Sequence, residues 1–100
     1  MNNEQIEQLD LSWDIDEGFF GNLRQGKFDN GLFTNFMSLL KSISFEEEEL
    51  IPRRVVSLLW YIPPFMEWQR ERVANTISPK DYNYKINEIH SELERILGYP

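Results

Sequence analysis

Apolar residues recur along this chain at intervals of three and four, the spacing that places side chains on one face of an α-helix. In residues 32–43 this repeat follows the turn signal Phe28-Asp29-Asn30-Gly31 and predicts an amphipathic helix that ends near Ser42. The repeat consists of Phe33, Phe36, Met37, Leu40 and Ile43. Period-two alternation never extends beyond four residues, so the pattern predicts an all-α fold.

The clearest helix signals lie near the end of the chain. Ser78 is a favoured N-cap residue, Pro79 suits the first helical position, and Gly98 suits the position after the last turn. The apolar residues between them have helical spacing: Tyr82, Ile86, Ile89, Leu93, Ile96 and Leu97. We predict one long helix whose apolar stripe faces a core.

The highest concentration of bulky apolar side chains lies in residues 50–68. Pro52 suits a first helical turn and Pro63-Pro64 interrupts a helix, so we predict one helix from Pro52 to about Tyr61 and a second that starts at Pro64. Apolar residues surround the first helix and predict burial on all sides: Val55, Val56, Leu58, Leu59 and Ile62. The aromatic residues Phe19, Phe20, Phe33, Phe36, Trp60 and Trp68 are likewise assigned to the core.

A helix with internal glycines is predicted before the central segment. It covers residues 17–25, with Asp16 as the candidate N-cap and Gly26 as the glycine after its end. Gly18 and Gly21 weaken this helix, but they allow another backbone to approach it closely.

Two further helices are predicted from shorter signals, and the spacing also gives the extent of the helix that starts at Pro64. Residues 3–9 suit a short helix, and Ser44-Phe45-Glu46-Glu47 has the form of a capping box that starts a helix from Phe45 to about Leu50. Residues 65–77 also have helical spacing. The inward positions of this last helix are Phe65, Trp68 or Gln69, Arg72 or Val73, and Thr76 or Ile77.

Length and composition set the broad class. A chain of 100 residues corresponds to one domain, residues 1–100, and the pattern predicts a compact helical bundle of about five to six helices. The absence of cysteine excludes disulfides, thiolate zinc sites and cysteine nucleophiles. The first residues do not resemble a signal peptide, and the apolar run at 55–62 is shorter than the ~20 residues that cross a bilayer. We expect a cytoplasmic protein.

Negative charge is concentrated in the first half of the chain. The net charge is −7, of which residues 1–49, with eleven acidic and three basic residues, carry −8. Residues 50–100, with six acidic and seven basic residues, carry +1. An acidic surface repels nucleic acid and attracts basic partners, although it can also serve solubility alone.

Patterns typical of catalysis are absent from the sequence. No glycine-rich phosphate loop, G-x-S-x-G or H-E-x-x-H motif occurs, and the only histidine, His90, is expected to be a partly exposed structural residue. An EF-hand counted from Asp14 places Gly18 at position five instead of six and Gln25 at position twelve, where glutamate is required. We therefore expect no enzyme, catalytic residue, cofactor or metal, and a carboxylate metalloenzyme is the least favoured alternative.

Two acidic clusters provide the candidate binding residues. The first comprises Asp10, Asp14, Asp16 and Glu17 around Trp13, and the second comprises Glu46, Glu47, Glu48 and Glu49. Acids are also favoured in the first turn of a helix, so a cap or a solvated helix start is the alternative for each cluster. Trp13 is either a binding anchor or a core residue.

Three stretches of the chain share a pattern with a known family. They are Gly18-Phe19-Phe20-Gly21-Asn22-Leu23-Arg24-Gln25-Gly26-Lys27-Phe28, Leu32-Phe33-Thr34-Asn35-Phe36, and the Pro- and Trp-rich residues 50–68. Together with size, acidity and missing catalytic groups, they are similar to the small immunity proteins of bacterial contact-dependent inhibition and polymorphic toxin systems. The resemblance implies a cytoplasmic protein that binds the C-terminal toxin domain of a secreted protein, often a nuclease, and blocks its active site or its access to substrate.

Our first hypothesis is therefore an immunity protein that is monomeric until it meets its toxin. A nuclease must be basic where it grips phosphates, so the acidic clusters would occupy that surface, with Trp13 as an anchor. Members of such families diverge quickly, so no contact residue is carried over from them. The alternative is a helical adaptor or regulatory subunit whose last helix forms a partner groove or a homodimer face.

Overall fold

The computed structural model describes residues 1–98, which form six α-helices and no β-strand. The helices are α1 (Asn3–Leu11), α2 (Phe19–Arg24), α3 (Asn30–Ser42), α4 (Arg53–Trp60), α5 (Ile62–Trp68) and α6 (Pro79–Leu97). The predicted all-α class is therefore confirmed. None of these helices combines the length and the apolar composition that a membrane crossing needs.

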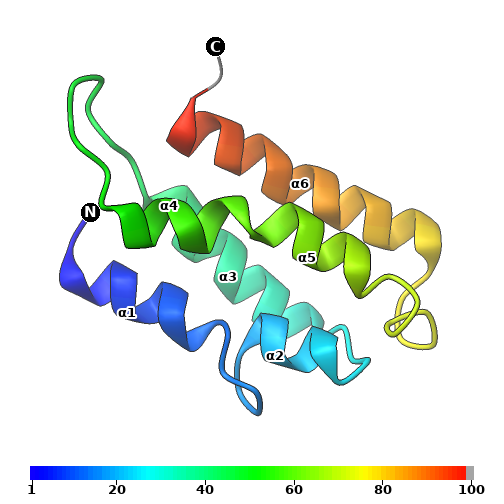
Figure 1. Ribbon diagram of the computed structural model, residues 1–100. Helices are drawn as coiled ribbons and strands as arrows, with labels where there is room; N and C mark the ends of the chain where they lie inside the picture. The colour runs from blue at the N-terminus through cyan, green and yellow to red at the C-terminus, as the bar shows by residue number, and fades with distance from the viewer. Residues whose placement is uncertain (99–100) are drawn as a thin grey trace.

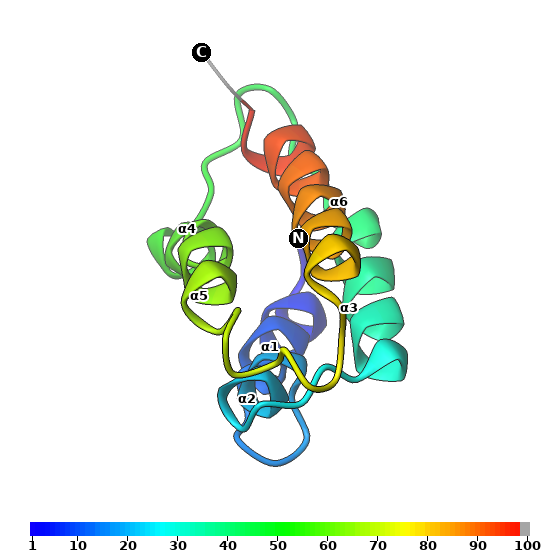
Figure 2. The ribbon, with the colours of Figure 1, turned by 90° about the vertical axis from the view of Figure 1, so that its right-hand side faces the viewer.

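Helices α3 and α6 face the α4–α5 pair across the core, and α1 and α2 lie below both pairs (Figures 1 and 2). Helices α4 and α5 follow one another across the front of the molecule, with α1 and α2 below them and α3 behind (Figure 1). Turned by 90°, the molecule shows α3 beside α6 on one side and the α4–α5 pair on the other (Figure 2). Apolar side chains from all six helices meet in one cluster between these groups.

The two helices with the clearest sequence signals are confirmed together with their caps. The Asp29 carboxylate accepts a hydrogen bond from the Leu32 amide at 2.9 Å, and the Ser78 hydroxyl accepts one from the Asp81 amide at 3.1 Å. The apolar stripes of α3 and α6 are buried as predicted. Periodicity and capping therefore fix these two helices locally.

Arg95 links α6 to the C-terminal end of α3. Its guanidinium donates to the carbonyl oxygens of Leu40 and Ile43, at 2.9 Å each. Carbonyls at the end of a helix lack partners within the helix, and they carry the negative end of its dipole. Arg95 therefore provides hydrogen-bond donors for the last carbonyls of α3 and fixes the position at which the connection to α4 begins.

Tyr82 joins α6 to α5 inside the core. Its hydroxyl donates to the Met66 carbonyl at 2.7 Å. Burial, only partly opposed by the nearby Arg70, raises the pKa of Tyr82 well above its usual value. The hydroxyl therefore stays protonated and remains a donor.

The close backbone approach predicted at the glycines is confirmed. Main-chain atoms of residues 11–15 lie directly against Gly18 and Gly21 of the α2 segment. A Cβ at position 21 would overlap the Asp14 carbonyl and lie 2.7 Å from the Ile15 Cα. The chain between α1 and α2 is therefore packed backbone to backbone on α2. Gly26 follows α2 with a φ of +84°, as its predicted role after the helix end requires.

The prediction that α4 is buried on all sides is wrong. Val55 and Leu59 are buried, whereas Arg53, Ser57 and Trp60 form an exposed face. Val56 and Leu58 lie between these faces and are partly covered. Helix α4 is thus an ordinary amphipathic helix that covers one side of the core.

The predicted helix from Phe45 to Leu50 does not form. Residues 43–52 are a projecting connection with a single turn, closed by hydrogen bonds between Glu46 and Glu49. Four adjacent glutamates repel one another, and six residues ahead of Pro52 are too few to offset the cost of helix nucleation. We call residues 43–52 the glutamate loop.

The helix predicted for residues 65–77 stops at Trp68 and is followed by successive turns. The Thr76 hydroxyl accepts from the Phe28 amide at 3.0 Å, and its one hydrogen is within reach of the Val73 carbonyl at 3.0 Å and the Gly26 carbonyl at 3.3 Å. These long-range bonds pull the segment towards the end of α2, and they compete with a regular helix. Of the alternative inward positions, Gln69 and Val73 are buried, and Trp68 and Arg72 are exposed.

Candidate functional site

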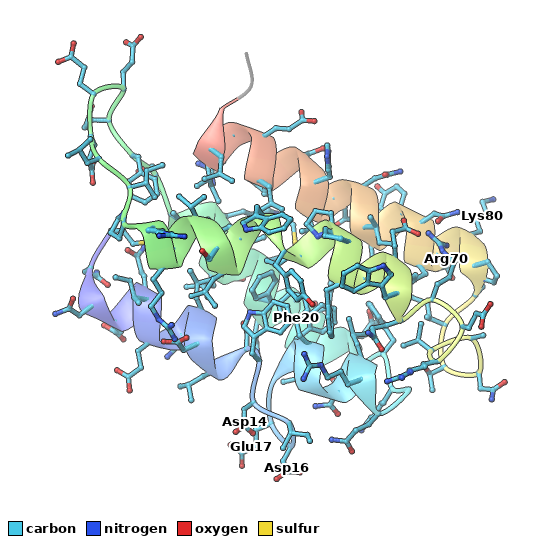
Figure 3. The ribbon with its side chains drawn as sticks, viewed as in Figure 1. Asp14, Asp16, Glu17, Phe20, Arg70 and Lys80 are labelled. Carbon is cyan, nitrogen blue, oxygen red and sulfur yellow. The ribbon has the colours of Figure 1, made fainter. Side chains whose placement is uncertain are left out.

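The first acidic cluster lies mainly in the connection between α1 and α2. Asp14, Asp16 and Glu17 are all exposed there, and their side chains extend together from one edge of the molecule (Figure 3). We call residues 14–17 the acidic turn. No Lys, Arg or His side chain within residues 1–98 forms an ion pair with these three carboxylates. Their negative charge is therefore available at the surface.

Asp14 has a structural task within the acidic turn. One of its carboxylate oxygens accepts hydrogen bonds from the amides of Asp16 and Glu17, at 3.1 and 2.9 Å. The predicted role of Asp16 as N-cap of the following helix is wrong, because Gly18 occupies that position. Asp16 and Glu17 are consequently the members of the turn whose carboxylates are not used inside the fold.

Polar side chains of α2 hold the acidic turn in place. The Asn22 amide nitrogen donates to the carbonyls of Gly18 and Asp16, at 2.8 and 3.2 Å. The Gln25 side chain donates to the carbonyl of Ile15. Together with the close approach at Gly21, these bonds make the turn a preorganised surface feature, which lowers the entropy cost of binding through it.

The remaining candidate acids do not join the acidic turn. Asp10 is half-buried and forms an ion pair with Arg54 of α4. The residues of the second cluster, Glu46, Glu47, Glu48 and Glu49, are exposed on the glutamate loop. That loop projects from a different corner of the molecule in both views (Figures 1 and 2). The nine predicted residues therefore form separate features and not one continuous surface.

Trp13 lies beneath the surface and packs on the core. Its ring stacks on Phe20 with centroids 4.4 Å apart, and it contacts the edge of Phe65 at 4.8 Å. Its indole N–H is buried and has no hydrogen-bond partner within residues 1–98. Of the two roles considered for this residue, these contacts favour the core.

Two other tryptophans, assigned to the core from sequence, are exposed. Trp60 is 57 % exposed and Trp68 is 63 % exposed. Tyr61 lies between them, with ring centroids 6.0 Å from Trp60 and 5.7 Å from Trp68. We call Trp60, Tyr61 and Trp68 the aromatic ridge. Large exposed aromatic side chains in a group are typical of protein-binding surfaces.

The sequence contained a signal for this exposure. Trp60 follows Arg53 and Ser57 at intervals of four and three, so it shares the polar face of α4. The concentration of apolar residues around it obscured that relation. Exposure of Trp68 follows if the inward stripe runs through Phe65, Gln69 and Val73. The sequence allowed this stripe but did not distinguish it from one through Trp68 and Arg72.

Trp13 links the aromatic ridge to the acidic turn. The Trp13 ring lies 5.8 Å from the Tyr61 ring, and Asp14 is the residue that follows Trp13. The ion pair between Asp10 and Arg54 holds α1 against the start of α4. The exposed aromatic side chains and the unpaired carboxylates are therefore connected through Trp13, while the carboxylates extend from the lower edge of the molecule (Figure 3).

Helix α6 does not provide the open apolar seam that an adaptor function would need. Its apolar stripe from Tyr82 to Ile96 is buried in the core, Leu97 is partly covered, and within residues 1–98 its large exposed apolar side chain is Tyr84. His90 is exposed and lies 3.0 Å from Glu94, one turn away. Across residues 1–98, no three His, Asp or Glu side chains gather in a group able to hold a metal ion.

Comparisons with protein-family models, with curated proteins and with solved structures give no match to this chain.

Proposed function

We propose that this protein is an immunity protein that binds and neutralises the basic toxin domain of a bacterial secreted protein, and that it does so in the cytoplasm. The observation that supports this most is the exposed aromatic ridge, which is linked through Trp13 to a turn whose carboxylates form no ion pair within residues 1–98. The family resemblance of residues 18–68 points in the same direction.

The two surface features supply complementary parts of a protein-binding site. Tryptophan and tyrosine are the residues that most often carry binding energy, because they bury a large area with few rotatable bonds. Exposed carboxylates attract a positively charged partner and speed encounter. A nuclease is positively charged where it contacts phosphates, so it has the surface that these carboxylates complement.

The direct test begins with the gene next to the one that encodes this chain. If that gene encodes a large secreted protein, its basic C-terminal domain should form a complex with this protein in size-exclusion chromatography and calorimetry. Co-expression should protect cells from the domain. A domain that kills cells equally in the presence of this protein, with no complex formed, would refute the proposal.

We expect the aromatic ridge to dominate the dissociation rate of this complex. Trp60→Ala and Trp68→Ala should each weaken binding ~30-fold, which corresponds to about 2 kcal/mol, mainly through faster dissociation. Surface plasmon resonance on the immobilised toxin domain measures this effect. Tyr84→Ala is the matched control, because Tyr84 is an equally exposed aromatic residue on α6. If Tyr84→Ala weakened binding as much as the ridge variants, the ridge would not be the anchor.

We expect the acidic turn to act on the association rate. The double variant Asp16→Asn with Glu17→Gln should slow association ~5-fold at low salt and reduce its salt dependence. Asp14 is left unchanged because it holds the turn. Glu47→Gln with Glu48→Gln removes the same charge from the glutamate loop. If only this second pair slowed association, the partner would bind at the loop instead.

A further inference from the structure

A groove lies next to the acidic turn, where α1, α3 and the start of α2 meet. It encloses about 180 Å³, on the scale of one large side chain. Its exposed lining is about half polar and half apolar, and the polar groups come from the acidic turn and from the segments on either side of the groove. The lining residues that matter for binding are Gln8, Leu11, Glu17, Leu32, Asn35 and Leu39.

Three of the four polar side chains of the groove are not used by the fold, whereas the Ser12 hydroxyl donates to the Leu9 carbonyl. Within residues 1–98, the side chains of Gln8, Glu17 and Asn35 form no hydrogen bond or ion pair to other residues. One is a carboxylate and the other two are amides with acceptor oxygens. All three are exposed hydrogen-bond acceptors next to apolar side chains, and each is free to accept a hydrogen bond from a ligand.

The charged residue among those that line the groove is Glu17, and it is negative. Residues 1–17, which supply one wall and the acidic turn, contain six acidic residues and no lysine or arginine. Arg54 compensates one of the six by pairing with Asp10. A group that enters the groove from solvent therefore gains most if it is positively charged.

We propose that this groove receives an arginine side chain of the basic partner. This inference rests on the proposed function and names the contact that its acidic turn makes. The apolar part of an arginine matches the walls formed by Leu11, Leu32 and Leu39. Its planar guanidinium offers five donors, enough to bond Glu17 together with the amide oxygens of Gln8 and Asn35.

Other side chains fit the groove less well. A purely apolar side chain would desolvate the Glu17 carboxylate without replacing its hydrogen bonds with water. Lysine carries the charge, but its compact ammonium group cannot contact several separated acceptors in one plane.

The test uses a small probe and does not need the partner. The ¹⁵N-labelled protein is titrated with Nα-acetyl-arginine N-methylamide and followed by heteronuclear NMR. Amide signals of groove residues should shift and saturate, with a dissociation constant on the order of 1 mM. The corresponding citrulline derivative, which has the same shape without the charge, should bind at least ~5-fold more weakly, and so should the lysine derivative.

Variants locate the binding. Glu17→Gln should weaken the arginine probe ~5-fold, whereas Glu71→Gln should leave it nearly unchanged, because Glu71 is an exposed acid that lies outside both the groove and the acidic turn. Shifts that spread over all acidic residues, or that are lost equally in both variants, would overturn the inference. So would equal binding of the citrulline probe. If the arginine probe does not bind in the groove, only this inference is refuted. The proposed toxin complex also uses the aromatic ridge, and its own binding test would still decide it.

Discussion

Replacing Gly21 with alanine should cost about 4 kcal/mol or more in the free energy of unfolding, a large part of the stability of a typical domain. The added methyl group would overlap the Asp14 carbonyl, and the neighbouring Ile15 Cα leaves no room for a small adjustment. Backbone atoms on both sides cannot change rotamer to relieve this overlap, so the turn must detach from α2. Urea unfolding followed by circular dichroism would measure the loss.

Gly31→Ala is the matched control for this prediction. Gly31 lies in the first turn of α3, and the nearest atom to an added Cβ is the flexible Asp29 carboxylate oxygen at 3.3 Å. Alanine is a better helix former than glycine, so this variant should be neutral or gain up to about 1 kcal/mol. Equal stability losses in the two variants would show that the close approach at position 21 is not what makes glycine necessary there.

Trp13→Ala should destabilise the fold by about 3 kcal/mol, because it removes the ring that stacks on Phe20 and contacts Phe65. Trp13→Phe should stay within about 1 kcal/mol of the parent protein. The smaller ring keeps most of the aromatic contacts, and it removes a buried N–H that has no partner within residues 1–98. Both values come from the same urea unfolding measurement.

This pair of variants also separates the two roles considered for Trp13. A core residue loses stability on truncation and regains most of it with phenylalanine. An anchor would leave stability unchanged in both variants and weaken the toxin complex instead. If stability were unchanged and binding were weakened, Trp13 and not the aromatic ridge would be the anchor of the proposed interface.

The helices that could be predicted from sequence are those for which periodicity and capping agree. In α3 and α6, a side-chain cap, a regular apolar stripe and a suitable last turn all lie within the segment itself. The helix predicted at Phe45 had a capping sequence but almost no apolar stripe, so nothing offset the repulsion among its glutamates. Beyond Trp68, the contacts of Thr76 with Gly26 and Phe28 decide the path of the chain. Those contacts span about fifty residues and have no local signature.

The candidate site could be predicted only in part. The sequence identified Asp16 and Glu17, which the structure exposes beside each other, because charge patterning does not depend on tertiary contacts. Trp60 and Trp68 were missed because hydrophobicity alone favours burial, and only their positions on the helix reveal exposure. The groove between α1 and α3 is formed by residues distant in sequence, so no local pattern could have indicated it.

The way in which the acidic turn is attached has an evolutionary consequence. The hydrogen bonds that Asn22 and Gln25 make to it end on main-chain carbonyls, and the contact at Gly21 is also with main-chain atoms. The identities of the outward side chains at positions 16 and 17 are therefore not needed to keep the turn in place. Substitutions at these two positions could therefore change which partner the protein binds without loss of the fold. Partner specificity and stability can evolve independently at this turn.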